Sequence, residues 1–163
     1  MMTDEDLQRI KDELEIRNLV GKLATMADHA EDLTEYFTLW TEDGTFDMRE
    51  PFGRQEGDPA SAWKVSGLEA LRENRKQLRA TGFQGPDTNV WHANTTLHIT
   101  INDATNAESQ SYWVLYGSRD KVEVLRIGHY HDRFRKEGGR WKMAYRTVTP
   151  GRAGTVPPDS ARG

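Results

Sequence analysis

Cysteine is absent from the 163-residue sequence, and its absence excludes several kinds of chemistry at once. Without thiols the chain has no disulfide, no thiolate nucleophile and no thiolate ligand for zinc. Basic blocks are missing as well, because the 22 lysines and arginines are scattered and are outnumbered by 26 acidic residues, which gives a net charge of −4. A nucleic-acid-binding surface needs clustered positive charge, so nucleic acid is not an expected partner.

Long hydrophobic runs are also missing. The most apolar stretch, residues 19–27, is interrupted by Lys22 and is far shorter than the roughly 20 apolar residues that cross a bilayer. The N-terminus is acidic, with Asp4, Glu5 and Asp6, whereas a secretory signal combines basic residues with an apolar segment. We therefore expect a cytoplasmic protein without a membrane partner. The length is near that of one domain, so a single domain is predicted.

Sequence motifs for common cofactors are absent too. The chain has no dinucleotide-binding glycine fingerprint, phosphate loop, nucleophile elbow or zinc-helix motif, so chemistry without a cofactor is predicted. His129 and His131 would share one face of a strand, and this spacing can bring two imidazoles to one metal ion. No third ligand accompanies them at a recognisable spacing, and we therefore predict no metal site.

The apolar pattern predicts helices first and strands afterwards. Helical spacing predicts a long first helix that starts after Thr3 and ends within residues 29–32, a short helix over 33–40 and a surface helix over 68–80. Strands are predicted at 45–48, 90–101, 107–116, 122–134 and 140–148, the last four as an antiparallel meander. Residues 49–67 are predicted to form a long loop, and residues 150–163 a mobile tail beyond a domain of residues 1–149. This order indicates an α+β fold whose helices cover one face of a strongly curved antiparallel sheet.

Several local patterns occur in a recognisable order. Glu-Ile-Arg-Asn-Leu at 15–19 leads to Asp28, residues 40–46 read Trp-Thr-Glu-Asp-Gly-Thr-Phe, and Val-Trp-His at 90–92 runs on to 96–97, Thr-Leu. Gly-His-Tyr-His-Asp-Arg-Phe at 128–134 and Gly-Gly-Arg-Trp-Lys at 138–142 follow. Over about residues 15–148 the chain resembles the SnoaL-like family of the nuclear transport factor 2-like superfamily, which includes scytalone dehydratase, bile-acid dehydratase, hexachlorocyclohexane dehydrochlorinase and polyketide cyclases. The resemblance implies a cone-shaped α+β barrel.

The resemblance also implies a site. In the dehydratases and the dehydrochlorinase of the family, an Asp late in the first helix and a His on a long strand form the working pair, and the matching residues here are Asp28 and His92. An Arg on the last strand often completes the pocket, and Arg146 matches it, while Tyr130 is expected to line the cavity. The bile-acid dehydratase carries a Tyr five residues before the Asp, whereas this chain has Leu23, which offers neither a phenol nor an ammonium group.

The chemistry of these residue types fits proton abstraction. A carboxylate bonded to one imidazole nitrogen fixes the tautomer in which the other nitrogen can accept a proton, and a guanidinium can hold a carboxylate or stabilise developing negative charge. Each residue alone also has a plainer interpretation. Asp28 lies near a helix end, where a solvated Asp is common, and strict alternation puts His92 with Asn94, Thr96, His98 and Thr100 on the polar side of its strand, which could face solvent or a pocket.

Aromatic residues could form the wall of a pocket, although most aromatic residues are core. We assign Trp40 and Trp63 to substrate binding, the latter because an aromatic residue in a long polar loop can close over a ligand. The basic run from Arg72 to Arg79 is interpreted as a solvated helix face. Because family members associate through the outer face of the sheet and residues 112–116 are apolar on both faces, we expect a homo-oligomer, either a trimer or a dimer.

Together these features favour a cofactor-independent lyase or isomerase. Its simplest form is a dehydratase that uses Asp28 and His92 to abstract a proton from a small hydrophobic hydroxylated or carbonyl compound. A polyketide-type cyclase could use the same base. From a different class, a non-catalytic ligand-binding domain, or a subunit like the small partner of ring-hydroxylating dioxygenases, is the alternative.

Overall fold

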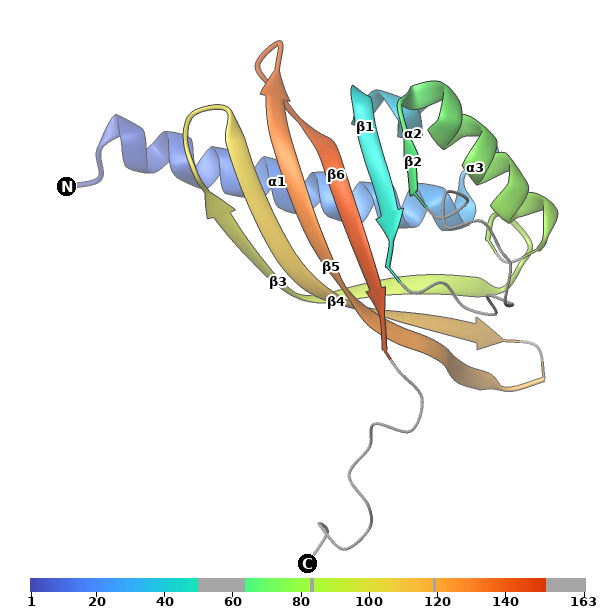
Figure 1. Cartoon of the computed structure of the whole chain (residues 1–163). Helices are drawn as coiled ribbons and strands as arrows, with labels where there is room; N and C mark the ends of the chain where they lie inside the picture. Colours follow the sequence, from blue (N-terminus) through green and yellow to red (C-terminus); the bar gives the residue numbers. More distant parts are fainter. Residues whose placement is uncertain (50–63, 83, 119, 152–163) are drawn as a thin grey trace, which may run out of the picture.

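The computed structural model describes residues 1–49, 64–82, 84–118 and 120–151. Its helices are α1 (Asp4–His29), α2 (Thr34–Thr38) and α3 (Leu68–Ala80). Its strands are β1 (Trp40–Met48), β2 (Lys64–Ser66), β3 (Val90–Ile101), β4 (Asn106–Ser118), β5 (Val122–Glu137) and β6 (Arg140–Pro150). In Figure 1 the long helix α1 crosses the curved sheet, and α3 lies beside β1 and β2. The predicted α+β fold is confirmed.

Helix α1 starts where its sequence predicts. The Thr3 hydroxyl accepts the Asp6 N–H at 3.1 Å and the Asp6 carboxylate accepts the Thr3 N–H at 2.9 Å, so this capping box satisfies two donors that the helix start leaves open. Its first turns are exposed and extend beyond the sheet (Figure 1). From Ile16 to Asp28 one face is buried, and the helix ends at His29, within the predicted range.

The sheet has six strands in the order β2-β1-β6-β5-β4-β3. The predicted meander of β3 to β6 is confirmed. The sheet differs from the prediction because β1 runs parallel to β6, which makes it mixed, and because it stays open within the described residues. The predicted strand of residues 45–48 was too short, because β1 begins at Trp40 and α2 ends at Thr38, and the predicted loop of residues 49–67 contains β2. Strands β4, β5 and β6 also run two or three residues beyond their predicted ends, to Ser118, Glu137 and Pro150. Residues 50–63 and the tail from 152 lie outside the described residues.

Strand β3 contains a β-bulge. Thr95 pairs with Tyr112 and His98 pairs with Gln110, so β3 has one more residue than β4 in this interval, and Thr96 takes the left-handed φ of 56°. Before the bulge His92 contacts Asp28 of α1 and the polar side-chain atoms of Asn94 are buried, and after it Leu97, Ile99 and Ile101 pack on the core. The strict alternation assumed from the sequence was therefore wrong for the second half of β3.

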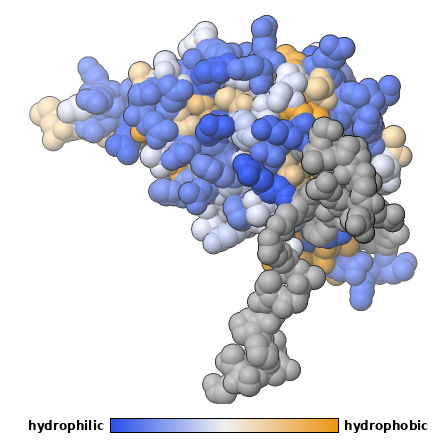
Figure 2. All heavy atoms as spheres, in the orientation of Figure 1, coloured by the Kyte–Doolittle hydropathy of each residue, from blue (hydrophilic) through white to orange (hydrophobic). Residues whose placement is uncertain are grey.

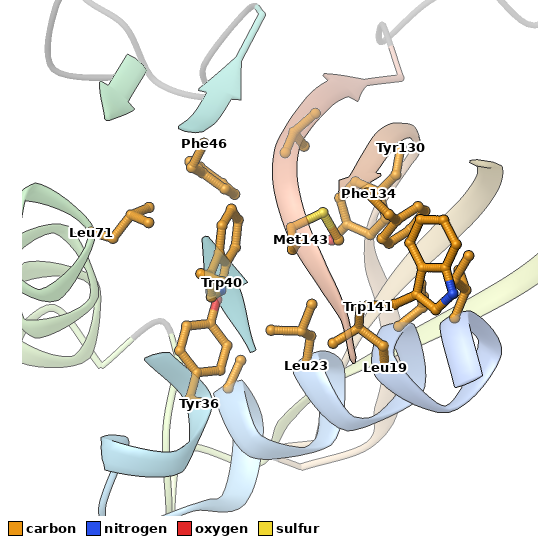
Figure 3. Packing of buried hydrophobic residues seen from close by; sticks show 14 of the residues in the cluster. Leu19, Leu23, Tyr36, Trp40, Phe46, Leu71, Tyr130, Phe134, Trp141 and Met143 are labelled. Atoms are coloured by element: carbon orange, nitrogen blue, oxygen red, sulfur yellow. The ribbon is translucent and has the colours of Figure 1, made fainter. Parts of the chain in front are cut away.

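The hydrophobic core fills the space between the helices and the inner face of the sheet. Figure 3 shows Leu19 and Leu23 of α1 facing Trp141, Met143 and Phe134 of the sheet. A second part of the same cluster joins Tyr36, Trp40, Phe46 and Leu71 between α2, β1 and α3. Hydrophilic residues predominate on the face shown in Figure 2. None of the described helices is long and apolar enough to span a membrane.

Candidate active site

A cavity of about 80 Å³ lies between the last turns of α1, helix α3 and the inner face of the sheet. Leu23, Ala27, Phe46 and Val148 give it a mainly apolar wall. Its polar lining residues include Tyr36, Arg75, Gln84, His92, Arg126, Tyr130 and Arg146. An apolar cavity with a few convergent polar groups is the usual form of a small-molecule site.

Asp28 and His92 meet at this cavity. The Asp28 carboxylate contacts the His92 ring nitrogen Nδ1 at 2.7 Å through Oδ1 and accepts the His92 backbone N–H at 2.6 Å through Oδ2. The Asp28 side chain is 3% exposed and the His92 side chain 14%. With Nδ1 held by the carboxylate, Nε2 is the ring nitrogen that remains for a ligand, in the tautomer suited to accept a proton.

Two features of the fold hold this pair together. Asp28 sits in the last turn of α1, where the helix carbonyls lack intrahelical partners, and Arg79 of α3 donates through Nη2 to the carbonyl oxygens of Ala27 at 3.3 Å and Ala30 at 2.7 Å. At the other end of the contact, the bulge at Thr96 lets β3 present His92 to the cavity and still place its later residues on the core. Arg79 thus fixes the end of α1 that bears Asp28, and the bulge fixes the direction of the start of β3 that bears His92.

Arg146 lines the cavity but is already paired. Its Nε and Nη2 donate to the two carboxylate oxygens of Asp132 at 2.9 and 2.7 Å, and Asp132 is fully buried. Burial alone would lower the pKa of Arg146, but the carboxylate of Asp132 outweighs burial and raises it above the ordinary value. The guanidinium also lies 4.1 Å from the centre of the Tyr130 ring. The Arg146 charge is therefore largely balanced within the protein.

Tyr130 lies between this ion pair and the rest of the cavity wall. Its ring stacks on Trp113 at 5.8 Å, and Trp113 lies 6.4 Å from the His92 ring. Burial raises the pKa of Tyr130 to about 12, against the opposing effect of Arg146. The phenol therefore keeps its proton at neutral pH and can act as a hydrogen-bond donor.

Of the residues predicted to bind substrate, Trp40 does not lie at the cavity. Trp40 is 1% exposed and is packed in the core near Tyr36, because the parallel pairing of β1 with β6 directs it between α2 and the sheet. Trp63 lies outside the described residues. His131 is on the outer face, where its ring contacts Glu108 at 3.2 Å. Across the described ranges, no group of three or more His, Cys, Asp or Glu side chains is arranged to hold a metal ion.

The structure also brings in residues that the sequence interpretation missed. Arg75 is 5% exposed and lines the cavity, so the interpretation of residues 72–79 as a solvated face was wrong for Arg75, although Arg72 and Lys76 are exposed. The signal was available, since Arg75 follows Leu71 by four residues and precedes Leu78 by three, which puts it on the apolar face of α3. Asp132 could have been found in the same way, because it alternates with Tyr130 and Phe134 on the inner side of β5.

Comparison with known proteins agrees with this fold. The family model described as a SnoaL-like domain matches residues 8–147. Three solved structures from Novosphingobium aromaticivorans superpose on the chain. An NTF2-like protein with a cystatin-like fold is 18% identical with a TM-score of 0.70, covering 95% of this chain and 94% of that one. The beta subunit of a putative aromatic-ring-hydroxylating dioxygenase is 17% identical with a TM-score of 0.68, covering 92% and 95%.

The third structure, a putative scytalone dehydratase, is 16% identical with a TM-score of 0.63, covering 89% of this chain and 87% of that one. At these identities the likeness concerns the fold alone. No match was found among curated proteins. The family model covers most of the sequence, so this chain belongs to the SnoaL-like family, and its fold is similar to that of the NTF2-like protein compared above.

Proposed function

We propose that the protein is a cofactor-independent lyase or isomerase, most simply a dehydratase acting on a small hydrophobic hydroxylated or carbonyl compound. The observation that carries the proposal is the contact between Asp28 and His92 Nδ1 at the wall of an apolar cavity. The SnoaL-like family and the fold of a putative scytalone dehydratase support the same class of reaction.

In this mechanism His92 is the base. Its Nε2 takes a proton from the carbon next to a carbonyl group, and the C–H electron pair passes to the carbonyl oxygen as an enolate. Asp28 balances the positive charge of the imidazolium. Return of the proton to a β-hydroxyl group releases water and leaves a carbon–carbon double bond, whereas its return to another carbon gives an isomer. The Tyr130 phenol is a donor for the enolate oxygen.

The contribution of Arg146 is narrower than the resemblance implies. The two nitrogens that would grip a substrate carboxylate side-on are engaged by Asp132. Within the described part of the chain Nη1 has no such acceptor, so its NH₂ group remains for an oxygen of the substrate. We therefore assign Arg146 chiefly to positioning Tyr130, on which it stacks.

Proton exchange in D₂O tests the proposal directly. Small hydrophobic β-hydroxy carbonyl compounds are incubated with the protein, and deuterium incorporation and elimination are followed by NMR. His92→Ala should lower the exchange rate by about 10²–10⁴-fold, the usual contribution of a general base. Asp28→Asn should cost a similar factor because the amide favours the wrong tautomer. His98→Ala is the matched control, since His98 lies on the same strand but is exposed.

The outcomes separate the alternatives. Proton exchange that persists in His92→Ala would show that another group is the base, and the assignment of the Asp28–His92 pair would be wrong. Proton exchange followed by ring closure instead of elimination would identify a polyketide-type cyclase. Ligand binding without exchange would identify a binding domain. Co-purification with a larger iron–sulfur protein would support the subunit alternative.

We also propose that the chain forms a homo-oligomer, either a trimer or a dimer. Its support is a set of exposed apolar residues brought together on the outer face by the pairing of β3, β4 and β5. They are Trp91, Tyr112, Val124 and Ile127, between 42% and 59% exposed. The cytoplasmic location and the domain limit at residue 149 stay predictions.

A further inference from the structure

Arg75 is a buried cation for which the described residues supply no countercharge. It is 5% exposed, and within the described residues no carboxylate forms an ion pair with it. Ionised side chains are almost never fully buried unless they are paired, because removing a charge from water without compensation is costly. Its position on the cavity wall therefore needs an explanation other than packing.

The contacts of Arg75 orient the guanidinium without neutralising it. Nη1 donates to the side-chain oxygen of Gln84 at 2.8 Å, and Gln84 is itself buried. The guanidinium carbon lies 4.7 Å from the centre of the Phe46 ring and 5.7 Å from that of Tyr36. An amide and two aromatic rings are neutral partners, so they hold the plane of the guanidinium while its full charge remains.

One edge of the guanidinium is left open. Nε is buried and has no hydrogen-bond partner, and Nη2 donates to none of the described residues. Arg146, on the same cavity, uses this same pair of nitrogens to bind both carboxylate oxygens of Asp132. Among the described residues the cavity thus has two buried arginines, Arg146 with a carboxylate supplied by Asp132 and Arg75 with none.

We propose that Arg75 binds a carboxylate of the ligand through Nε and Nη2, and that the cavity therefore selects small hydrophobic acids over their neutral counterparts. A planar carboxylate matches the two parallel N–H groups of a guanidinium edge, and a bidentate pair of this kind is among the strongest hydrogen-bonded contacts in proteins. The inference rests on the proposed function for its site, since His92 lines the same cavity. It makes Arg75 a specificity-determining residue rather than a base.

Binding of matched acids and amides tests the inference without any turnover. Benzoate and the straight-chain acids from butyrate to octanoate are each compared with their primary amides by calorimetric titration and by the rise in Tm. The acid should bind at least tenfold more tightly than its amide to the unaltered chain. Arg75→Met should abolish this preference. Lys76→Met, which removes the same charge from an adjacent position whose side chain is 80% exposed, should retain it.

Arg75→Lys keeps the proposal testable if Arg75→Met does not fold. The ammonium keeps the charge but lacks the planar edge, so the acid-to-amide ratio should fall although the protein still binds anions weakly. Equal affinity for acids and amides, an unchanged ratio in the Arg75 variants, or no binding of any acid at 10 mM, a concentration of order 10 times a weak millimolar Kd, would each overturn the proposal.

The proposed reaction and this inference can fail separately. His92→Ala should keep the preference for acids, because that preference depends on Arg75. Acid binding without proton exchange would therefore leave the inference standing and remove the dehydratase. Proton exchange with neutral substrates, together with no preference for acids, would support the dehydratase and exclude the role proposed for Arg75.

Discussion

The ion pair of Asp132 and Arg146 allows the sharpest prediction about stability. Both side chains are buried, at 0% and 8% exposure, and two hydrogen bonds of 2.7 and 2.9 Å join them. Exposed ion pairs contribute less than about 1 kcal/mol, whereas removing one partner of a buried pair typically costs about 3–5 kcal/mol because the other charge stays buried and unpaired. Asp132→Asn and Arg146→Met should each show the larger cost.

The double variant carries the decisive information. Replacing both partners by neutral groups leaves no lone charge, so Asp132→Asn with Arg146→Met should be more stable than either single variant, with a coupling energy above about 2 kcal/mol. In thermal denaturation of a domain of this size 1 kcal/mol corresponds to about 2–4 °C, so each single change should lower Tm by about 6–20 °C.

Urea denaturation gives the same free energies independently, with the slope checking that the unfolding remains two-state. Glu73→Gln is the control, because Glu73 pairs with Lys76 on an exposed helix face and should change Tm by less than about 2 °C. Single-variant costs below about 1 kcal/mol, or costs that simply add in the double variant, would refute the reasoning from burial.

Three further predictions follow from the same region and from the outer face of the sheet. Burial raises the pKa of Tyr130 to about 12, above the value of about 10 for a Tyr in the unfolded chain. The contribution of the protonated phenol to the free energy of unfolding is therefore complete below pH 10 and is lost as the pH rises through 12. In Tyr130→Phe the free energy of unfolding should therefore fall by about 3 kcal/mol less between pH 10 and 12 than in the unaltered chain. The same fall in both proteins would contradict the burial of the phenol. Gly128→Ala should lower stability by about 1–3 kcal/mol, because the added Cβ would lie 2.6 Å from the Trp113 ring. Gly21→Ala, whose Cβ would have nothing within 4 Å, should instead raise stability by about 0.5–1 kcal/mol. Equal effects of the two substitutions in denaturation would contradict this packing. Light scattering should give a mass two or three times 18.6 kDa, and Ile127→Asp should reduce it to the monomer; a monomer at micromolar concentration without the substitution would exclude the proposed assembly.

Local signals in the sequence were sufficient for most elements. Helix α3 has the predicted limits, Leu68–Ala80, because regular apolar spacing and a following Thr-Gly pair mark both its face and its end. The limits of β3, Val90–Ile101, were also predicted. The parallel pairing of β1 with β6 could not be predicted in this way, since it joins segments about a hundred residues apart.

The candidate site was predicted from the resemblance more than from local pattern. Alone, Asp28 looked like a helix-end residue, yet the structure buries it against His92. Arg146 was expected to face a ligand, and its pairing with Asp132 depends on a register between β5 and β6 that no local pattern specifies. The charge of Arg75 alone indicates a solvated position, and only its helical phase, shared with Leu71 and Leu78, indicates that it is buried.

The extra residue in β3 has a consequence for how relatives of this chain should be compared. Before Thr96 the even-numbered residues of β3 face the interior, and after Thr96 the odd-numbered residues do. A rule that assigns inward and outward residues by simple alternation therefore fails at this point. A relative that lacks the inserted residue must exchange its polar and apolar positions in one half of the strand. Only then can it keep both the imidazole in the cavity and the apolar side chains on the core. In an alignment, a one-residue gap at this point should therefore be accompanied by such a switch between the two halves of the strand.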